Sequence, residues 1–159
     1  MKIEMVETDR IVPYARNPRK NTAAVDKVAA SLREFGFRQP IVVDREMTVI
    51  AGHTRLLAAK KLGLTEVPIH IAEGLTETQI KAYRIADNRI GAEASWDADL
   101  LKLEMTDLQN FGIDVALTGF DAGELEKIMY DELNPEQFDS YGEDIETNHE
   151  CPKCGYKWS

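Results

Sequence analysis

The chain has 159 residues, in which 19 Lys and Arg stand against 28 Asp and Glu, a formal net charge of −9. Hydrophobic residues make up 43% and charged residues 30%, which excludes a wholly disordered chain and predicts one ordinary domain with appendages. The sequence has no apolar run near the roughly 18 residues of a membrane helix, and it opens without a hydrophobic signal segment. We therefore expect a cytoplasmic protein with no membrane partner.

The charge is distributed unevenly along the chain. Residues 1–92 hold 15 Lys and Arg against 11 Asp and Glu, a net charge of +4, whereas residues 93–159 hold 4 against 17, a net charge of −13. This asymmetry predicts a division of labour between the two parts. The acidic part argues against strong unaided DNA binding and favours a nucleotide in a pocket as the phosphate ligand.

Residues 1–92 have the pattern of an α/β (α+β) domain with a small mixed sheet and packed helices. Short apolar runs rich in β-branched residues predict strands at 2–6, 10–12, 41–43, 47–51 and 67–71. The runs 41–43 and 47–51 are typical of a hairpin. Pro68, which lacks an N–H group, favours an edge position for the last strand.

Helical spacing of apolar residues predicts three helices in the same part of the chain. The first is capped by Asn21 or Thr22 and stops at Gly36, and the second follows Gly52 and stops at Gly63. The third opens on a capping box at residues 76–79 and ends near residues 86–89.

Residues 93–159 are predicted to form appendages to this domain. A helical extension covers 93–133, with helices that begin near residues 95–97 and 121–124 and a loop or short extended link at 111–120. Residues 134–150 contain six acids and no Lys or Arg, which indicates a solvated linker. Residues 151–159 form a tail that contains a CxxC motif.

The first candidate site is a basic loop that Pro18 stiffens. Arg16, Asn17 and Arg19 lie on it, and guanidinium groups bind phosphate oxygens in a bidentate manner. A preformed loop also loses less entropy when it binds. The alternative is a solvated basic turn.

The second candidate site is the sequence G-H-T-R at residues 52–55, where an apolar strand meets the start of a helix. Free backbone N–H groups and the positive end of the helix dipole converge there, and Gly52 allows a ligand to approach the backbone. This predicts phosphate binding by Gly52, His53, Thr54 and Arg55, whereas the alternative is an ordinary turn. His53 is also a candidate general base, although a lone His is more often structural.

The third and fourth candidate sites are possible metal sites. Asp87 and Asn88 supply oxygen atoms suited to Mg²⁺, and the alternative for Asn88 is a helix C-cap. Cys151 and Cys154 have the spacing of one zinc knuckle, for which His149 is a third ligand candidate and another subunit a source of the fourth. The alternatives are a redox CxxC or a remnant half-site that binds nothing.

In order along the chain, these segments resemble the ParB N-terminal-like superfamily, the fold of ParB partition proteins and sulfiredoxins. The resemblance is carried by residues 17–19, 30–36, 39–43, 50–63 and 86–89. The form with G-H-T-R and A-D-N-R is similar to stand-alone ParB-like proteins of phages and prophages, which are often found beside DNA methyltransferases.

The resemblance implies a nucleotide site. Partition ParB proteins bind the triphosphate of CTP at a G-E-R-R motif, onto which Gly52 and Arg55 carry over, whereas His53 and Thr54 depart from it. Gln39, Asn88 and Arg89 match further family segments. The implied cofactor is Mg²⁺ with a nucleoside triphosphate, either CTP or ATP.

The leading hypothesis is a ParB-like nucleotide-binding protein in phage or bacterial DNA metabolism, with DNA or a DNA methyltransferase as partner and a homodimer as a further expectation. One alternative is a metal-dependent nuclease or nucleotidase in which His53 or Asp87 activates water. Another is a non-catalytic adaptor. We expect residues 93–159 to be too few and too acidic to form a helix-turn-helix reader of DNA.

Overall fold

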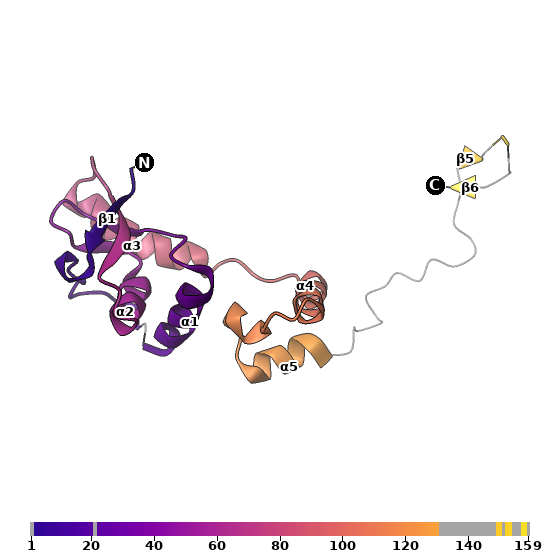
Figure 1. The fold of residues 1–159 in the computed structure, drawn as a ribbon. Helices are drawn as coiled ribbons and strands as arrows, with labels where there is room; N and C mark the ends of the chain where they lie inside the picture. Colours follow the sequence, from indigo (N-terminus) through magenta and orange to yellow (C-terminus); the bar gives the residue numbers. More distant parts are fainter. Residues whose placement is uncertain (1, 21, 131–148, 151, 154–156, 159) are drawn as a thin grey trace.

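The computed structural model describes residues 2–20, 22–130, 149–150, 152–153 and 157–158. The N-terminal domain has four strands and three α-helices, which Figure 1 shows in chain order. They are β1 (Glu4–Glu7), α1 (Val25–Phe35), β2 (Ile41–Val43), β3 (Val49–Ala51), α2 (His53–Lys61), β4 (Glu66–Ile71) and α3 (Glu77–Gly91).

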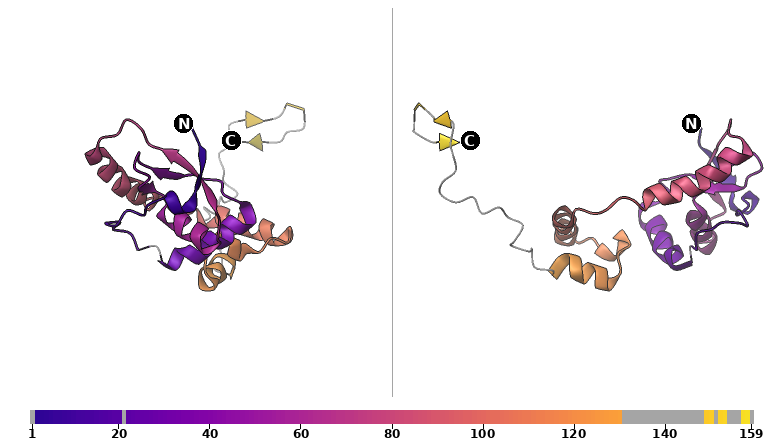
Figure 2. Two further views of the ribbon diagram at one scale, coloured as in Figure 1. Left: turned by 60° about the vertical axis from the view of Figure 1, so that its left-hand side comes forward. Right: turned by 180° about the vertical axis from the view of Figure 1, so that it is seen from behind.

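The strands form one sheet in the order β1-β4-β2-β3. β4 pairs antiparallel with β1 and parallel with β2, and β2 pairs antiparallel with β3. This confirms the predicted mixed sheet and the hairpin. α1 and α2 pack against each other on one side of the sheet, and α3 lies against β3 (Figures 1 and 2).

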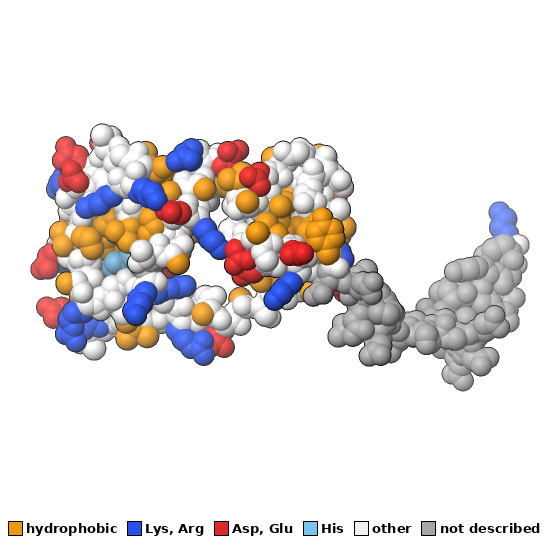
Figure 3. Space-filling view, turned by 90° about the horizontal axis from the view of Figure 1, so that it is seen from below, with side chains coloured by type: hydrophobic (Ala, Val, Ile, Leu, Met, Phe, Trp, Pro, Cys, Tyr) orange, Lys and Arg blue, Asp and Glu red, His pale blue; other side chains and the backbone are white. Residues whose placement is uncertain are grey.

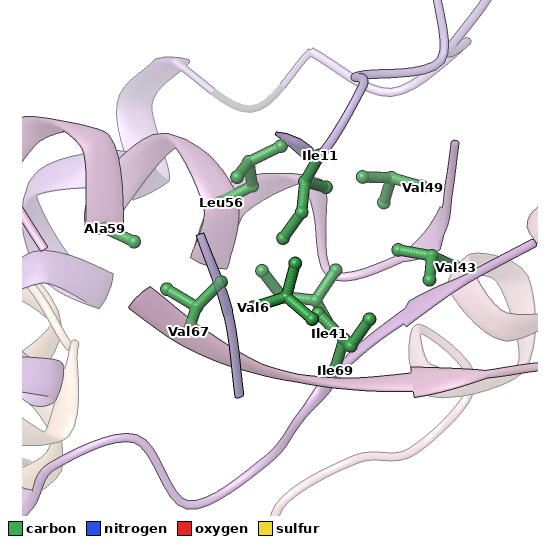
Figure 4. Packing of buried hydrophobic residues seen from close by; sticks show 9 residues of the cluster. All are labelled: Val6, Ile11, Ile41, Val43, Val49, Leu56, Ala59, Val67 and Ile69. Carbon is green, nitrogen blue, oxygen red and sulfur yellow. The ribbon is translucent and has the colours of Figure 1, made fainter. Parts of the chain in front are cut away.

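The hydrophobic core lies between the sheet and α2, and Figure 4 shows its side chains pointing toward one another. Full burial of an aliphatic side chain is worth about 1.5–3 kcal/mol, so this cluster is the main source of stability for the domain. Its buried members are Val6, Ile11, Ile41, Val43, Val49, Leu56, Ala59, Val67 and Ile69.

Two of the strand predictions are wrong. The segment predicted as a strand at 10–12 begins as the 3-10 turn η1 (Thr8–Arg10), because the Thr8 hydroxyl donates to the Leu64 carbonyl over 2.6 Å and holds the chain in a bend. Val12 forms only an isolated bridge to Thr48. Pro68 lies in the central strand β4 rather than at an edge. The sheet tolerates it because pairing with β2 begins one residue later, at Ile69.

The helix boundaries differ in detail from the sequence pattern. α1 follows a 3-10 turn, η2 (Thr22–Ala24), and Ala24 occupies its N-cap, so Thr22 is not the cap; Asn21 lies outside the described residues. Gly36 ends α1 as predicted. The predicted capping box of α3 is present, with reciprocal hydrogen bonds between Thr76 and Gln79.

The C-terminal helices confirm the predicted helical character of residues 93–130. α4 (Ala98–Asn110) is capped by Asp97, and α5 (Ala122–Tyr130) packs against it. Between them lies a 3-10 helix, η3 (Val115–Thr118), which contacts α1. Figure 3 shows hydrophobic side chains exposed on this part of the molecule, with Asp and Glu beside them.

The last described elements are two short strands. β5 (His149–Glu150) pairs antiparallel with β6 (Lys157–Trp158), and these strands flank the CxxC residues in the sequence. The predicted acidic linker lies almost entirely outside the described residues. Among the described helices, none combines the length and the apolar character needed to cross a membrane.

Candidate functional site

The turn from β3 into α2 forms the centre of the candidate site. All three β3 residues are buried, and Gly52 then turns the chain with a φ of 101°, a conformation that L side chains rarely adopt. A Cβ atom at Gly52 would lie 3.4 Å from the Arg55 guanidinium carbon. Glycine therefore supplies both the turn and the space in which the Arg55 side chain folds back beneath it.

Arg55 joins this turn to the start of β2. Its Nη1 donates to the carbonyl oxygens of Gln39 over 2.8 Å and Pro40 over 2.7 Å. Gln39 thus contributes a main-chain carbonyl to the fixing of Arg55. Burial lowers the pKa of Arg55, and the negative charge of Asp87 opposes that shift. The side chain is a positioned cation, since an arginine keeps its charge in proteins.

A cavity of about 190 Å³ opens beside Gly52. It brings together most of the predicted site residues from the basic loop, the start of α2 and the third turn of α3. Its volume is below the roughly 300–1,000 Å³ of sites that enclose a whole small ligand, so it suits phosphate groups better than an entire nucleotide. The lining residues are Asn17, Arg19, Val28, Gly52, His53, Thr54, Arg55, Asp87 and Asn88.

The basic loop is fixed to α3 by side-chain hydrogen bonds. Arg19 Nη1 donates to Asn88 Oδ1 over 2.8 Å, and the Arg19 N–H donates to Asn17 Oδ1 over 3.3 Å. Asn88 Nδ2 donates to the Arg84 carbonyl over 2.8 Å. Asn88 lies inside α3, which continues to Gly91, so it is not the C-cap that the sequence offered as an alternative.

Besides Gln39, which contacts Arg55 through its main-chain carbonyl, two predicted phosphate-site residues do not line the cavity. Arg16 is exposed on the basic loop, three residues before the cavity-lining Arg19. Arg89 forms an ion pair with Glu93 one helical turn further on, and its side chain is 70% exposed. The angular spacing of the helix explains the second case, because consecutive helical residues point about 100° apart and Asn88 already faces the cavity.

His53 lines the cavity and has an unusual buried polar atom. Among the described residues, its Nε2 is the one buried side-chain nitrogen or oxygen without a hydrogen-bond partner. Burial lowers the pKa of His53, and the positive charge of Arg84 lowers it further. The imidazole is therefore neutral near pH 7 and has an unused hydrogen-bonding position.

The residues predicted to bind Mg²⁺ do not form a metal site of their own. Both amide atoms of Asn88 are engaged, by Arg19 and by the Arg84 carbonyl. Asp87 is then the one carboxylate among the cavity-lining residues, and it faces the Arg55 charge. Within the described part of the chain, no three His, Cys, Asp or Glu residues cluster as ligands would. Cys151, Cys154 and the side chain of His149 lie outside that part.

Sequence reasoning missed Arg84, which is only 7% exposed. Its Nε donates to the Val49 carbonyl over 3.1 Å, its Nη2 lies 3.4 Å from Asp44 Oδ2, and its guanidinium carbon lies 3.9 Å from the centre of the Tyr14 ring. One signal was available: Arg84 stands four residues after Ile80, on the face that packs against the sheet. It also lines a second cavity of about 590 Å³ that contains none of the predicted site residues.

Comparisons with known proteins agree with this architecture. Residues 1–88 match the ParB N-terminal domain family, and residues 99–151 match the ParB-methyltransferase HTH (helix-turn-helix) domain family. The ParB-like nuclease domain-containing protein YnaK of Escherichia coli K12 is 35% identical over 80 residues, which cover 50% of this chain and 92% of YnaK. The probable chromosome-partitioning protein ParB of Campylobacter jejuni is 38% identical over 89 residues. That match covers 53% of this chain but only 32% of the Campylobacter protein.

A solved structure shares the fold. The C-terminally truncated chromosome-partitioning protein ParB of Caulobacter crescentus, crystallised with CTP-γ-S, has a TM-score of 0.67 to this chain at 22% identity. The similarity covers 81% of this chain and 77% of the other. The predicted α+β class and the ParB-like fold are confirmed.

The second family match corrects an expectation from the sequence. The idea that residues 93–159 are too few and too acidic for a helix-turn-helix domain is wrong, because that domain family covers residues 99–151. Net charge does not decide whether helices pack. Met105 of α4 is buried although this part of the chain is acidic. Since the first match alone spans more than half of its residues, the chain belongs to the ParB N-terminal domain family.

Proposed function

We propose that this chain is a nucleotide-binding protein of DNA metabolism that holds the phosphates of a nucleoside triphosphate in the cavity beside Gly52. The observation that carries the proposal is the convergence of Arg19, Arg55 and the α2 N-terminus on one cavity. Arg19 is distant in sequence from Arg55, which lies in the first turn of α2. The Caulobacter ParB with bound CTP-γ-S supports CTP as the first nucleotide to test.

The charge distribution favours a phosphate ligand. Arg19 and Arg55 bring two positive charges to the cavity against the single carboxylate of Asp87. The N–H groups of the first turn of α2 add the positive end of a helix dipole. The nucleobase lies beyond this small cavity in the proposed complex. Inorganic triphosphate is therefore expected to bind as well. A Mg²⁺ ion that accompanies the nucleotide would be held by phosphate oxygens and water rather than by a protein cage.

The test is isothermal titration of the full chain with CTP, ATP, GTP, UTP and inorganic triphosphate. Binding of at least one nucleotide and of triphosphate is expected, with loss of affinity in Arg55→Ala. Because Arg55 also fixes residues 39 and 40, circular dichroism and thermal unfolding of this variant check that it folds. If the folded wild-type chain binds none of the five compounds, the proposal is wrong.

The partner is proposed to be a DNA-processing protein, with a DNA methyltransferase as the specific candidate. The match of residues 99–151 to the ParB-methyltransferase HTH family supports this. On α4 and the residues beside it, four large apolar side chains are more than half exposed, and exposed apolar surface favours a protein contact. They are Trp96, Leu100, Leu103 and Phe111.

Co-expression with the methyltransferase encoded nearest in the genome, followed by affinity purification, tests the partner. Leu100→Asp with Leu103→Asp should abolish co-purification, and Lys102→Ala on the same helix serves as the control. Light scattering on the same samples tests the expected homodimer. Retention of the methyltransferase by the double variant contradicts the proposed surface.

A nuclease is the second candidate function. The relative YnaK is named a ParB-like nuclease domain-containing protein, and in this chain His53 and Asp87 line the same cavity. Supercoiled plasmid is incubated with the chain and Mg²⁺ or Mn²⁺. Cleavage that is lost in both His53→Ala and Asp87→Ala supports the nuclease, whereas equal cleavage by wild type and variants points to a contaminant.

The CxxC segment is proposed to bind zinc shared between two chains, since Cys151 and Cys154 supply only two of the four ligands of a structural site. The paired strands β5 and β6 flank these residues in the sequence. Metal analysis of protein purified without chelators is expected to give about half a zinc per chain, and a Cys151→Ser, Cys154→Ser variant none. Zinc-free wild type would contradict this.

A further inference from the structure

The phosphate contacts proposed above do not account for the buried Nε2 atom of His53. His53 lines the cavity, and its Nε2 is buried without a hydrogen-bond partner among the described residues. A buried polar group without a partner is destabilising, and most buried polar groups in native proteins have a hydrogen-bond partner. A ligand atom placed against Nε2 recovers that cost on binding.

The position of His53 brings this atom to the proposed phosphates. His53 is the first residue of α2, directly after Gly52, so its ring starts from the helix end where free N–H groups attract anions. Thr54 and Arg55 line the same cavity. A phosphate bound at this helix end therefore lies within reach of the His53 ring.

The charged groups around His53 come from α2, the basic loop and α3, whereas α1 contributes the apolar Val28 to the cavity lining. Arg55 belongs to α2, Arg19 to the basic loop, and Arg84 and Asp87 to α3. Three of these four are cations, and the Arg84 charge together with burial lowers the pKa of His53 in the free chain. A bound anion with several negative charges makes the potential at His53 negative. The negative potential favours the protonated imidazole.

We propose that a phosphate oxygen of the bound nucleotide accepts a hydrogen bond from His53 Nε2, and that the chain takes up a proton from solution when it binds this ligand. The neutral ring carries one N–H group, and its other nitrogen gains the proton. This proposal rests on the proposed function of the same cavity and adds its regulation by pH. The affinity of the chain for the nucleotide increases as the pH falls from about 8 toward 6. For one linked proton the increase is at most about tenfold per pH unit.

Two substitutions separate this role from a structural one. His53→Gln keeps an amide N–H donor of similar reach but has no group that gains a proton. His70→Gln is the matched control, because His70 lies on β4, bonds the Lys2 carbonyl through Nδ1 and does not line the cavity. Both variants leave every arginine of the cavity in place.

The experiment is isothermal titration of the full chain with CTP and with inorganic triphosphate at pH 6.5, in two buffers of different ionisation enthalpy. The difference in heat gives the protons taken up. Protonation of the phosphate ligand itself is common to all variants and cancels between them. We expect wild type and His70→Gln to take up more protons than His53→Gln, by up to one per ligand.

The outcomes are distinguishable. If wild type and His53→Gln bind and take up protons equally, the His53 proposal is wrong while the nucleotide site stands. If folded wild type binds neither CTP nor triphosphate, both proposals fall. Should His53→Gln not fold, the ¹⁵N signals of the wild-type His53 ring decide. A titration midpoint raised by triphosphate supports the proposal, and an unchanged midpoint overturns it.

Discussion

Arg19 Nη1 donates a 2.8 Å hydrogen bond to Asn88 Oδ1, although the two residues are 69 positions apart. The bond closes one wall of the cavity, because it links the loop before α1 to the C-terminal part of α3. Asn88 is in turn bonded to the Arg84 carbonyl, so the loop is attached to a helix whose own position is fixed by the sheet. A guanidinium held in this way loses little freedom when a phosphate binds.

This arrangement predicts different roles for two arginines of one loop. Arg19→Ala should weaken binding of CTP or triphosphate about 10- to 100-fold, the effect of one lost charge-assisted hydrogen bond of about 1.5–3 kcal/mol. Arg16→Ala should change affinity less than about threefold, because Arg16 does not line the cavity and salt screens its charge there. Titrations at constant ionic strength compare the two. An equal loss in both variants would mean that the loop acts only through its net charge.

Gly52 should be needed for binding as well as for the turn. Gly52→Ala forces a side chain into the left-handed region at φ 101° and brings a Cβ to 3.4 Å from Arg55, so we expect a loss of about 1–2 kcal/mol in stability and a loss of phosphate binding. Gly63→Ala, at φ 69° with no atom within 4 Å, should lose similar stability but keep binding. Urea unfolding and titration measure both effects. Full binding by Gly52→Ala would contradict a ligand at this turn.

Arg84 should be the most costly charged side chain to remove from the N-terminal domain. Arg84→Met leaves Asp44 without its ion-pair partner and removes the contact with Tyr14, and we expect a loss of about 3–5 kcal/mol in the free energy of unfolding. Arg89→Met removes an exposed pair with Glu93 and should cost less than about 1 kcal/mol. Urea denaturation measures the free energy of unfolding of both variants. A similar loss in Arg84→Met and Arg89→Met would show that the burial of Arg84 does not increase its contribution to stability.

The stability of the free chain should depend on pH through His53. Burial and Arg84 lower the pKa of His53 below its ordinary value of 6.5, so the unfolded chain binds this proton more readily than the folded chain. The free energy of unfolding therefore falls as the pH drops below about 6.5, by at most about 1.4 kcal/mol per pH unit from this group. His53→Gln should remove that part of the pH dependence between pH 7.5 and 5.5, and His70→Gln should keep it. If the free energy of unfolding depends on pH in the same way in wild type and His53→Gln, the lowered pKa of His53 is contradicted.

Local patterns in the sequence determined much of the fold. Apolar spacing located α1, α2 and α3, β-branched runs located the β2–β3 hairpin and β4, and Gly36 and the Thr76 capping box marked helix ends correctly. These features depend on residues within one or two helical turns of each other, so a single sequence contains them. The order of the phosphate-site segments also indicated that they meet.

Only the tertiary structure decided what each site residue contacts. Pro68 lies in a central strand. One Arg55 nitrogen donates to the carbonyls of residues 39 and 40, and both amide atoms of Asn88 form hydrogen bonds. The tertiary structure also left His53 Nε2 without a partner among the described residues. Each of these depends on which groups the packed sheet and helices bring within about 3 Å, and hydrogen bonds weaken steeply beyond that distance. The sequence thus determined which residue types converge, and the packing of distant segments decided which of their atoms remain available to a ligand.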